Sequence, residues 1–362
     1  MKLKPSVNWL LVFIPITVAL EQLGGIAPPL IFFAAALAIV PAAKLIVHAT
    51  EQIAARTGDA VGGLLNATFG NAPELIIAIV ALRAGLLDMV RASLVGAVLA
   101  NLLLALGASL LLGGFKFKDL TYNAEAARVY GSMMLLAVIA LVVPSAFARF
   151  FASAEYLPRV RQLNVTLALI LLAAYGLYLL YMLKTHADHF RSVAGPADEH
   201  DTGPAWSVPR AVGSLIGASA LAAWMSEILV GAAEGTGQAL GMSEVFIGLI
   251  IVAVVGGAAE SLSAIAAARK GKLDLTLGIT FGSSIQIAMF VAPMLVLLSR
   301  LVAPEPLDLT FGRAETGVLF MSVLIGVVVS GDGRGNWFKG AQLLAVYLII
   351  AMMFFFMPGL AS

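Results

Sequence analysis

Long apolar runs separated by short polar segments make up most of the chain. About eleven of these runs approach the roughly 20 residues that a helix needs to cross about 30 Å of hydrocarbon. The runs are too long for strands and do not alternate, and in lipid only helices or closed barrels satisfy the backbone. The pattern therefore predicts an all-α integral membrane protein with about eleven transmembrane helices. They lie approximately at 7–23, 27–55, 60–83, 88–113, 129–147, 163–183, 208–237, 244–268, 273–300, 314–330 and 339–357.

The sequence also contains two related halves. Aligning Glu74 with Glu260, a shift of 186 positions, also aligns Gly70 with Gly256. Equivalent helices are five spans apart, an odd number, so the two halves are expected to have opposite orientations in the membrane. Inverted repeats with polar breaks at matching places are typical of transporters whose binding site lies near the membrane midplane. We expect an extra N-terminal helix (1–25), a first inverted five-helix repeat (26–184), a linker (185–206) and a second inverted repeat (207–362).

Composition supports a membrane protein and excludes several other classes. Hydrophobic residues make up 60% of the chain and charged residues 12%, about half the charged fraction of a soluble domain. A net charge of +1 gives no reason to expect a nucleic-acid partner, and the absence of cysteine excludes disulfides, thiolate metal sites and cysteine nucleophiles. No cleavage site follows the first apolar run, so we expect a retained helix there. The sequence carries no indication of oligomeric state.

The distribution of basic residues predicts the orientation. With the N-terminus in the cytoplasm, 15 of the 22 lysines and arginines, including every lysine, fall on the inner side. The positive-inside rule therefore favours a cytoplasmic N-terminus and an external C-terminus. The polar linker 185–206 is then cytoplasmic. We expect a multi-pass protein of a prokaryotic plasma (inner) membrane, because no long N-terminal tail precedes the first span.

Two glutamates interrupt the apolar runs at equivalent places. Glu74 lies in "GNAPELI" and Glu260 in "GGAAESL". A charged group at the bilayer centre costs roughly 2.5–3.5 kcal/mol, so such residues usually have a function. In an inverted repeat the two side chains are expected to converge across the pseudo-twofold axis. Two adjacent carboxylates need either a cation or protons, and competition between these ligands would produce a cation/proton exchanger.

The other polar groups near these glutamates predict the cation. Asn71 and Glu74 are three positions apart and share a helix face. All the candidate ligands are oxygens, which suit Ca²⁺ better than Zn²⁺, and only His48 among the histidines lies near a span. No cofactor is expected, since Ca²⁺ and H⁺ would be the transported ions. The candidate ligands are Glu74, Glu260, Asn71, Asn101, Gln286, Thr68, Ser283 and Ser284.

Three further glutamates could form a vestibule that guides cations or protons. Glu51, Glu227 and Glu234 lie in predicted spans or near their ends. Alternatively, they are ordinary interfacial carboxylates. For Asn71, Asn101 and Gln286, hydrogen bonding between packed helices is the competing interpretation.

These motifs resemble a known family. The segments "GGLLNATFGNAPELIIAIVAL", "SLVGAVLANLLLALG", "SEVFIGLIIVAVVGGAAES" and "KLDLTLGITFGSSIQIAMFVAP" are similar to the two repeats of the calcium/proton antiporters, the cation exchanger branch of the cation/calcium antiporter superfamily. The resemblance covers about residues 44–357. It implies one N-terminal helix plus two inverted five-helix repeats. It also implies that Glu74 and Glu260 bind the cation and exchange protons, with Asn71, Asn101, Ser283 and Gln286 as supporting ligands.

The sequence departs from the family pattern in both halves. Gly257 stands where the family carries Asn, and Ala97 and Ala100 stand where it tends to carry Ser. The expected function is secondary active exchange of cytoplasmic Ca²⁺ for H⁺ by alternating access. The main alternative is a Na⁺/Ca²⁺ or monovalent cation/H⁺ exchanger on the same scaffold, and a passive channel is another. An enzyme is not expected, because the chain lacks a His-Glu-x-x-His motif and "SGDG" differs from the motif of intramembrane aspartyl proteases.

Overall fold

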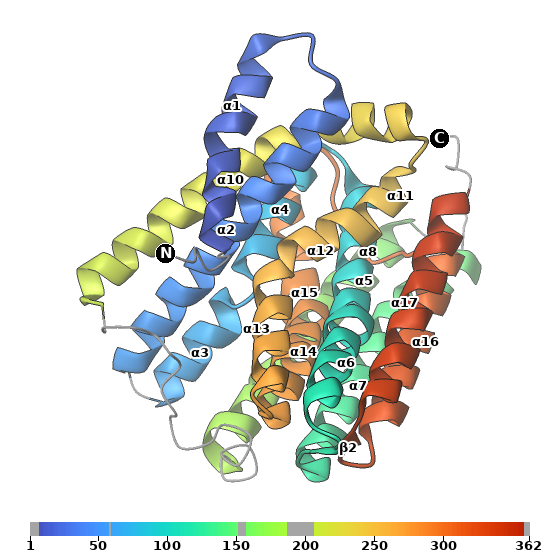
Figure 1. Ribbon diagram of the computed structural model, residues 1–362. Coiled ribbons are helices and arrows are strands. Elements are labelled where there is room, and N and C mark those ends of the chain that lie inside the picture. The colour runs from blue at the N-terminus through green and yellow to red at the C-terminus, as the bar shows by residue number, and fades with distance from the viewer. Residues whose placement is uncertain (1–6, 58, 151–156, 187–205, 358–362) are drawn as a thin grey trace, which may run out of the picture. The chain divides into compact units, whose positions relative to one another are not determined.

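The computed structural model is almost entirely helical (Figure 1). It describes residues 7–57, 59–150, 157–186 and 206–357. The chain forms two compact units, each built from segments of both sequence halves. Unit 1 comprises Met1–Ser93, Thr202–Ala259 and Phe354–Ser362, as far as these residues are described, and unit 2 comprises Leu94–Asp201 and Glu260–Met353 on the same condition. Most of the predicted linker, residues 187–205, lies outside the described residues.

Unit 1 contains the helix of the first Gly-rich motif and the helices that lead to the second one. It includes the beginnings of α5 (Leu87–Leu99) and α13 (Ala258–Arg269), together with η1 (Val7–Val12), α1 (Phe13–Leu23), α2 (Pro28–Thr57), α3 (Asp59–Phe69), α4 (Ala72–Arg83), α10 (Val208–Leu240), α11 (Glu244–Phe246), the π-helical η5 (Ile247–Val252) and α12 (Ala253–Gly256).

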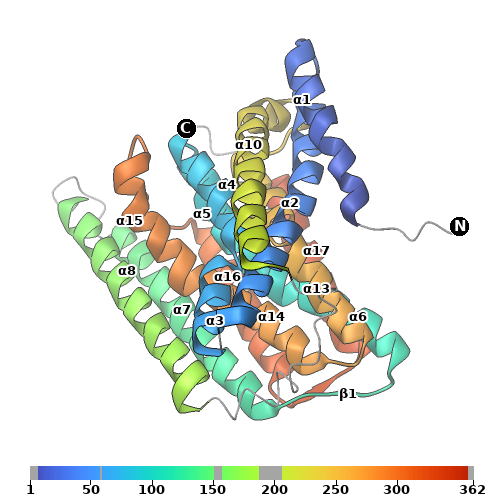
Figure 2. The ribbon, with the colours of Figure 1, turned by 90° about the vertical axis from the view of Figure 1, so that its left-hand side faces the viewer.

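Small residues bring the main helices of unit 1 close together. Figures 1 and 2 show α2 and α10 side by side, and α4 packs against both. Their shared core consists of Ala42, Ile46, Ala72, Ala218 and Ala222. Alanine allows helix backbones to approach closely, and such packing drives helix association where lipid is as apolar as the side chains.

Unit 2 contains the remaining helices and a short antiparallel strand pair. It includes most of α13 and α17 (Trp337–Phe356), together with η2 (Ala100–Ala105, π-helical), α6 (Leu106–Lys116), β1 (Leu120–Thr121), α7 (Ala124–Phe150), α8 (Leu157–Leu180), η4 (Tyr181–Thr185, π-helical), α14 (Leu273–Gln286), η6 (Ile287–Val291, π-helical), α15 (Ala292–Val302), α16 (Arg313–Ser330) and β2 (Arg334–Gly335).

Buried polar side chains hold the connection between α15 and α16 in unit 2. Asn164 Oδ1 accepts a hydrogen bond of 2.8 Å from the backbone N–H of Leu309. Ser145 Oγ accepts one of 2.8 Å from the N–H of Phe311. Because both side chains are buried, they satisfy backbone groups that would otherwise lose their hydrogen bonds to water.

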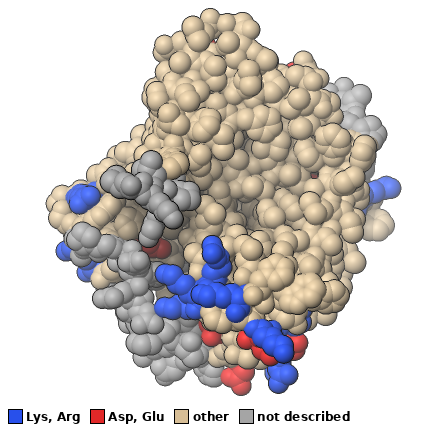
Figure 3. All heavy atoms as spheres, viewed as in Figure 1, with Lys and Arg blue, Asp and Glu red and all other residues tan. Residues whose placement is uncertain are grey.

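Basic side chains gather at one end of unit 2. Lys116 Nζ donates a hydrogen bond of 2.9 Å to the carbonyl of Arg269, and Arg334 lies in β2, paired with β1. Figure 3 shows lysine and arginine clustered toward the bottom of the view, around the end of α13. Lys116, Arg269 and Arg334 are among the 15 lysines and arginines that the predicted orientation places on the inner side.

Helix boundaries in the two sequence halves correspond. Shifted by 186 positions, the bounds of α4 coincide with those of α13, and the bounds of α6 with those of α15. The turns that follow α4 and α13 each contain a glycine with a φ of 78°, Gly85 and Gly271, in the left-handed region that favours glycine. The repeated sequence therefore produces a repeated local backbone.

The predicted count of eleven spans is not confirmed. Within the described part of the chain, eight helices are long and apolar enough to cross a membrane, and α11 to α13 would add a ninth as one broken span. The predicted span 7–23 is a shorter apolar helix, and 60–83 is divided between α3 and α4. The polar and Gly-rich residues inside the run at 60–83 interrupt the helix there, although the run as a whole remains apolar.

Candidate functional site

Glu74 and Glu260 each lie in the first turn of a helix that begins after a break. Glu74 belongs to α4, which starts after Asn71, and Glu260 belongs to α13, which starts after Gly257. The first N–H groups of a helix have no partner within the helix, and its dipole favours negative charge at this end. Both breaks thus create places where a carboxylate is stabilised electrostatically within an apolar segment.

In unit 1, the Glu74 carboxylate is buried against a glycine. Both of its oxygens are inaccessible to solvent and have no hydrogen-bond partner among the described residues. A Cβ on Gly256 would lie 2.9 Å from Cγ of Glu74, so only glycine leaves room for this side chain. Asn71, three positions earlier, is 1% exposed. An ionised carboxylate without hydrogen bonds is costly in such surroundings, so this group needs either a cation or a proton.

In unit 2, a hydrogen-bonded chain leads to Glu260. Asn101 Nδ2 donates to Ser283 Oγ at 3.0 Å, and Ser283 Oγ donates to Oε2 of Glu260. Asn101 and Ser283 are both buried. The amide therefore directs the serine proton toward the carboxylate, which fixes the position of the Glu260 side chain.

Two of the four π-helical segments in the described residues, η2 and η6, occur at equivalent positions beside polar side chains. Asn101 lies within η2, and Gln286 immediately precedes η6, which is the equivalent of η2 under the shift of 186 positions. Gln286 is 6% exposed, and its Nε2 has no hydrogen-bond partner among the described residues. Single π-helical turns within α-helices are frequent at functional sites. Sequence reasoning missed these segments, since their apolar residues also fit an ordinary α-helix.

Two of the candidate hydroxyls bond to their own helices. Thr68 Oγ1 donates to the carbonyl of Leu64 at 2.8 Å, and Ser284 Oγ donates to that of Thr280 at 2.8 Å. These are local backbone bonds that serine and threonine commonly make within helices. Ser283 differs from its neighbour because its hydroxyl reaches a carboxylate on another helix.

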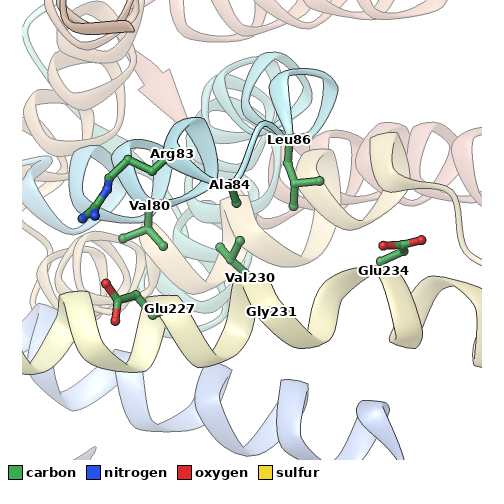
Figure 4. A pocket seen from close by; sticks show the side chains of 8 residues that line it. All are labelled: Val80, Arg83, Ala84, Leu86, Glu227, Val230, Gly231 and Glu234. Carbon is green, nitrogen blue, oxygen red and sulfur yellow. The ribbon is translucent and has the colours of Figure 1, made fainter. Parts of the chain in front are cut away.

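Two of the three predicted vestibule glutamates line one pocket of unit 1. Glu227 and Glu234 on α10 face Arg83 at the end of α4 across a cavity of about 440 Å³ (Figure 4). Figure 4 shows Glu227 and Arg83 toward one end and Glu234 toward the other. Glu51 does not line this pocket; its Oε2 lies 3.9 Å from His48 Nδ1, one turn earlier on α2. The structure therefore brings Glu227 and Glu234 to one pocket and leaves Glu51 outside it.

The described residues contain no group of three or more His, Cys, Asp or Glu placed to hold a metal ion. The two candidate carboxylates each have a neutral oxygen group associated with them: the amide of Asn71 lies three positions before Glu74 in the sequence, and the hydroxyl of Ser283 donates to Glu260. Such hard oxygen donors suit Ca²⁺. The low number of charged ligands also suits an ion that must be released as well as bound.

Comparison with known proteins gives matches over most of the chain. The family model described as "Sodium/calcium exchanger protein" matches residues 27–184 and 210–356. The chain is 39% identical over 341 residues to a Ca²⁺/H⁺ antiporter of Aphanothece halophytica, covering 91% of this chain and 90% of that protein. It is also 39% identical over 330 residues to the Ca²⁺/H⁺ antiporter ChaA of Bacillus subtilis strain 168, covering 91% and 93%.

The fold is similar to that of solved structures. The structure of native YfkE matches with a TM-score of 0.83 and 35% identity, covering 97% of this chain and 100% of that one. A second YfkE structure is described as that of a Ca²⁺/H⁺ antiporter protein. An all-α, multi-pass membrane architecture follows from these likenesses together with the apolar helices of the chain.

Proposed function

Because the chain belongs to the sodium/calcium exchanger protein family, we propose that it is a secondary active transporter that exchanges cytoplasmic Ca²⁺ for H⁺. The observation that carries this proposal is the identity of 39%, over nine-tenths of both chains, with proteins named Ca²⁺/H⁺ antiporters. A transporter of this kind is not an enzyme, and its ions are substrates. Relatives with these names do not favour the alternative of a Na⁺/Ca²⁺ or monovalent cation/H⁺ exchanger.

The chemistry of exchange follows from the two carboxylates, Glu74 and Glu260. Ca²⁺ binds the deprotonated form of a carboxylate, and binding of the ion is therefore coupled to proton release. Glu74, buried without hydrogen bonds, is stable only when a cation or a proton neutralises it. Glu260 accepts a hydrogen bond from Ser283, which orients its carboxylate for the same task. That the two carboxylates share one cation stays a prediction from the repeat.

Supporting groups complete the proposed transport path. Asn71, Asn101, Ser283 and Gln286 would supply neutral ligands or position the carboxylates. Glu227 and Glu234 outnumber the single cationic residue of the pocket, Arg83, so the net negative charge of its lining would raise the local concentration of cations. With the N-terminus in the cytoplasm and the C-terminus outside, proton influx would drive Ca²⁺ out of the cell through alternating access.

Flux measurements in reconstituted vesicles test this function. Purified protein in proteoliposomes with an acidic interior should take up ⁴⁵Ca²⁺, and a protonophore should abolish the uptake. Glu74→Gln and Glu260→Gln should each abolish exchange while leaving the protein inserted, since the amide cannot cycle between a metal-bound and a protonated form. A parallel arm replaces the proton gradient by a Na⁺ gradient. Robust uptake by both variants, or uptake driven only by Na⁺, would overturn the proposal.

A further inference from the structure

The two glutamates have different neutral neighbours, although their helices are equivalent. Asn71 precedes Glu74 by three positions, and the residue at the same distance before Glu260 is Gly257. Conversely, Ser283 donates a hydrogen bond to Glu260, and the residue equivalent to Ser283 in the first half is Ala97. Each half therefore retains one neutral oxygen group at these two positions and lacks the other.

The backbone does not require glycine at position 257. Gly257 has φ −80° and ψ 9°, and Asn71 has φ −99° and ψ 30°. Both conformations lie near the bridge region, which residues with a side chain adopt without a positive φ. The backbone has nearly the same conformation at Asn71 and at Gly257, so an asparagine side chain is compatible with the backbone at position 257.

Packing gives the neighbouring glycine a different reason to be there. A Cβ on Gly256 would approach Cγ of Glu74 to 2.9 Å, so a side chain at 256 would displace the carboxylate. Gly256 is thus required by the close approach of Glu74, whereas Gly257 has a backbone conformation that any residue adopts. What distinguishes Gly257 from Asn71 is the missing side-chain amide.

We infer that Gly257 is a specificity-determining position: by omitting the amide that Asn71 supplies in the other half, it leaves the transported Ca²⁺ with one protein oxygen fewer. Ca²⁺ takes about six to eight oxygen ligands, and the charge count and rigidity of that set tune its affinity over orders of magnitude, so a fixed neutral oxygen strengthens the set. With fewer protein oxygens, the ion keeps more of its own water, binds more weakly and is released more readily. This inference rests on the proposed function and identifies one residue that adjusts its affinity.

The test adds the amide back. Gly257→Asn is compared with Gly257→Ala, which introduces the same Cβ without an oxygen. The expected result is a Ca²⁺ KM and an equilibrium ⁴⁵Ca²⁺ dissociation constant that are roughly tenfold lower for Gly257→Asn than for Gly257→Ala. Mutation of a residue that supports a metal ligand changes metal affinity by roughly 10- to 100-fold, and the lower end of that range sets the scale for one neutral oxygen. Mg²⁺, which binds few protein ligands directly, should show a smaller difference between the two variants.

A second variant keeps the inference testable if Gly257→Asn fails to insert. Asn71→Gly removes the remaining amide, and it should raise the Ca²⁺ dissociation constant by a similar factor. Equal affinities of the two 257 variants, or an unchanged affinity of Asn71→Gly, would overturn the inference. Absence of proton-driven uptake by the unaltered protein would instead count against the proposed function. The ⁴⁵Ca²⁺ binding measurement, made on purified protein without a gradient, tests the role of Gly257 in either case.

Discussion

Replacing Ser283 by alanine isolates the contribution of the hydrogen-bonded chain in unit 2. The serine hydroxyl accepts from Asn101 at 3.0 Å and donates to the Glu260 carboxylate. Its removal deletes a hydrogen bond to a charged group and deprives a buried amide of its acceptor. Hydrogen bonds to charged groups contribute about 1.5–3 kcal/mol, which corresponds to roughly 10- to 150-fold in an equilibrium or rate. Glu260 is only half-buried, so water can replace part of the lost hydrogen bond, and we expect the lower end of this range. The predicted loss in kcat/KM for Ca²⁺ is about tenfold.

The adjacent serine provides a matched control. Ser284 is equally buried on α14, but its hydroxyl donates to the carbonyl of Thr280 in its own helix. Ser284→Ala should therefore change kcat/KM by less than about threefold, since local bonds of this kind contribute little to helix stability. Ser283→Thr, which keeps a hydroxyl at the same position, should recover most of the lost activity.

The assay is initial ⁴⁵Ca²⁺ uptake into acid-interior proteoliposomes over a range of Ca²⁺ concentrations. Thermal unfolding in detergent shows whether each variant is folded, so that a loss of activity is not confused with a loss of protein. If Ser283→Ala and Ser284→Ala behaved alike, the hydrogen bond to Glu260 would have no role in transport. The description of a positioned carboxylate in unit 2 would then be wrong.

Three further outcomes follow from other parts of the molecule. Replacing both Glu227 and Glu234 by Gln should raise the Ca²⁺ KM about two- to fivefold at low ionic strength. The increase should be smaller at high salt, because salt screens the attraction between the ion and the pocket, and an increase independent of salt would exclude electrostatic attraction. Asn164→Ala leaves the buried backbone N–H of Leu309 without an acceptor, so it should lower the free energy of unfolding by about 1–3 kcal/mol in a detergent denaturation series. A change near zero would show that this hydrogen bond does not stabilise the fold. Burial alone would raise the pKa of the Asp332 carboxyl. Hydrogen bonds from Lys339 and nearby backbone groups outweigh burial and hold this pKa below its ordinary value. The hydrogen-bonded Asp332 carboxylate should therefore stabilise the folded protein at a pH above the ordinary carboxyl pKa, and this stabilisation should be lost as the pH falls toward the lower folded-state pKa. Asp332→Asn should flatten that part of the curve of stability against pH, and an unchanged curve would refute the assignment.

The boundaries of the helices were largely predictable because lipid imposes a simple requirement. Every backbone polar group in hydrocarbon needs an internal partner, so a long apolar run forms a helix whatever its detailed sequence. The run at 88–113 became α5, η2 and α6 over Leu87–Lys116, and the run at 208–237 became α10 over Val208–Leu240. The breaks before Glu74 and Glu260 also follow from local sequence, since glycine and proline weaken a helix wherever it packs.

The arrangement of polar side chains was less predictable. Spacing identified Ser283 and Ser284 equally well, and only the packing of α13 beside α14 determines which hydroxyl reaches a carboxylate. The same limitation applies to the vestibule. Glu51 and Glu234 belong to the same predicted set, yet Glu51 lies beside His48 and Glu234 lines the pocket on α10.

The amino-acid order alone determined a helical membrane protein with two related halves and a glutamate at the matching break of each. Hydrophobic length and helix-breaking residues act locally, so they can be read without knowing which helices are neighbours. The tertiary structure determined the partners of those glutamates: the glycine that makes room for Glu74, and the serine and asparagine that orient Glu260. Hydrogen bonds and close contacts form over a few ångströms between residues far apart in the chain, and only packed helices bring such residues within reach.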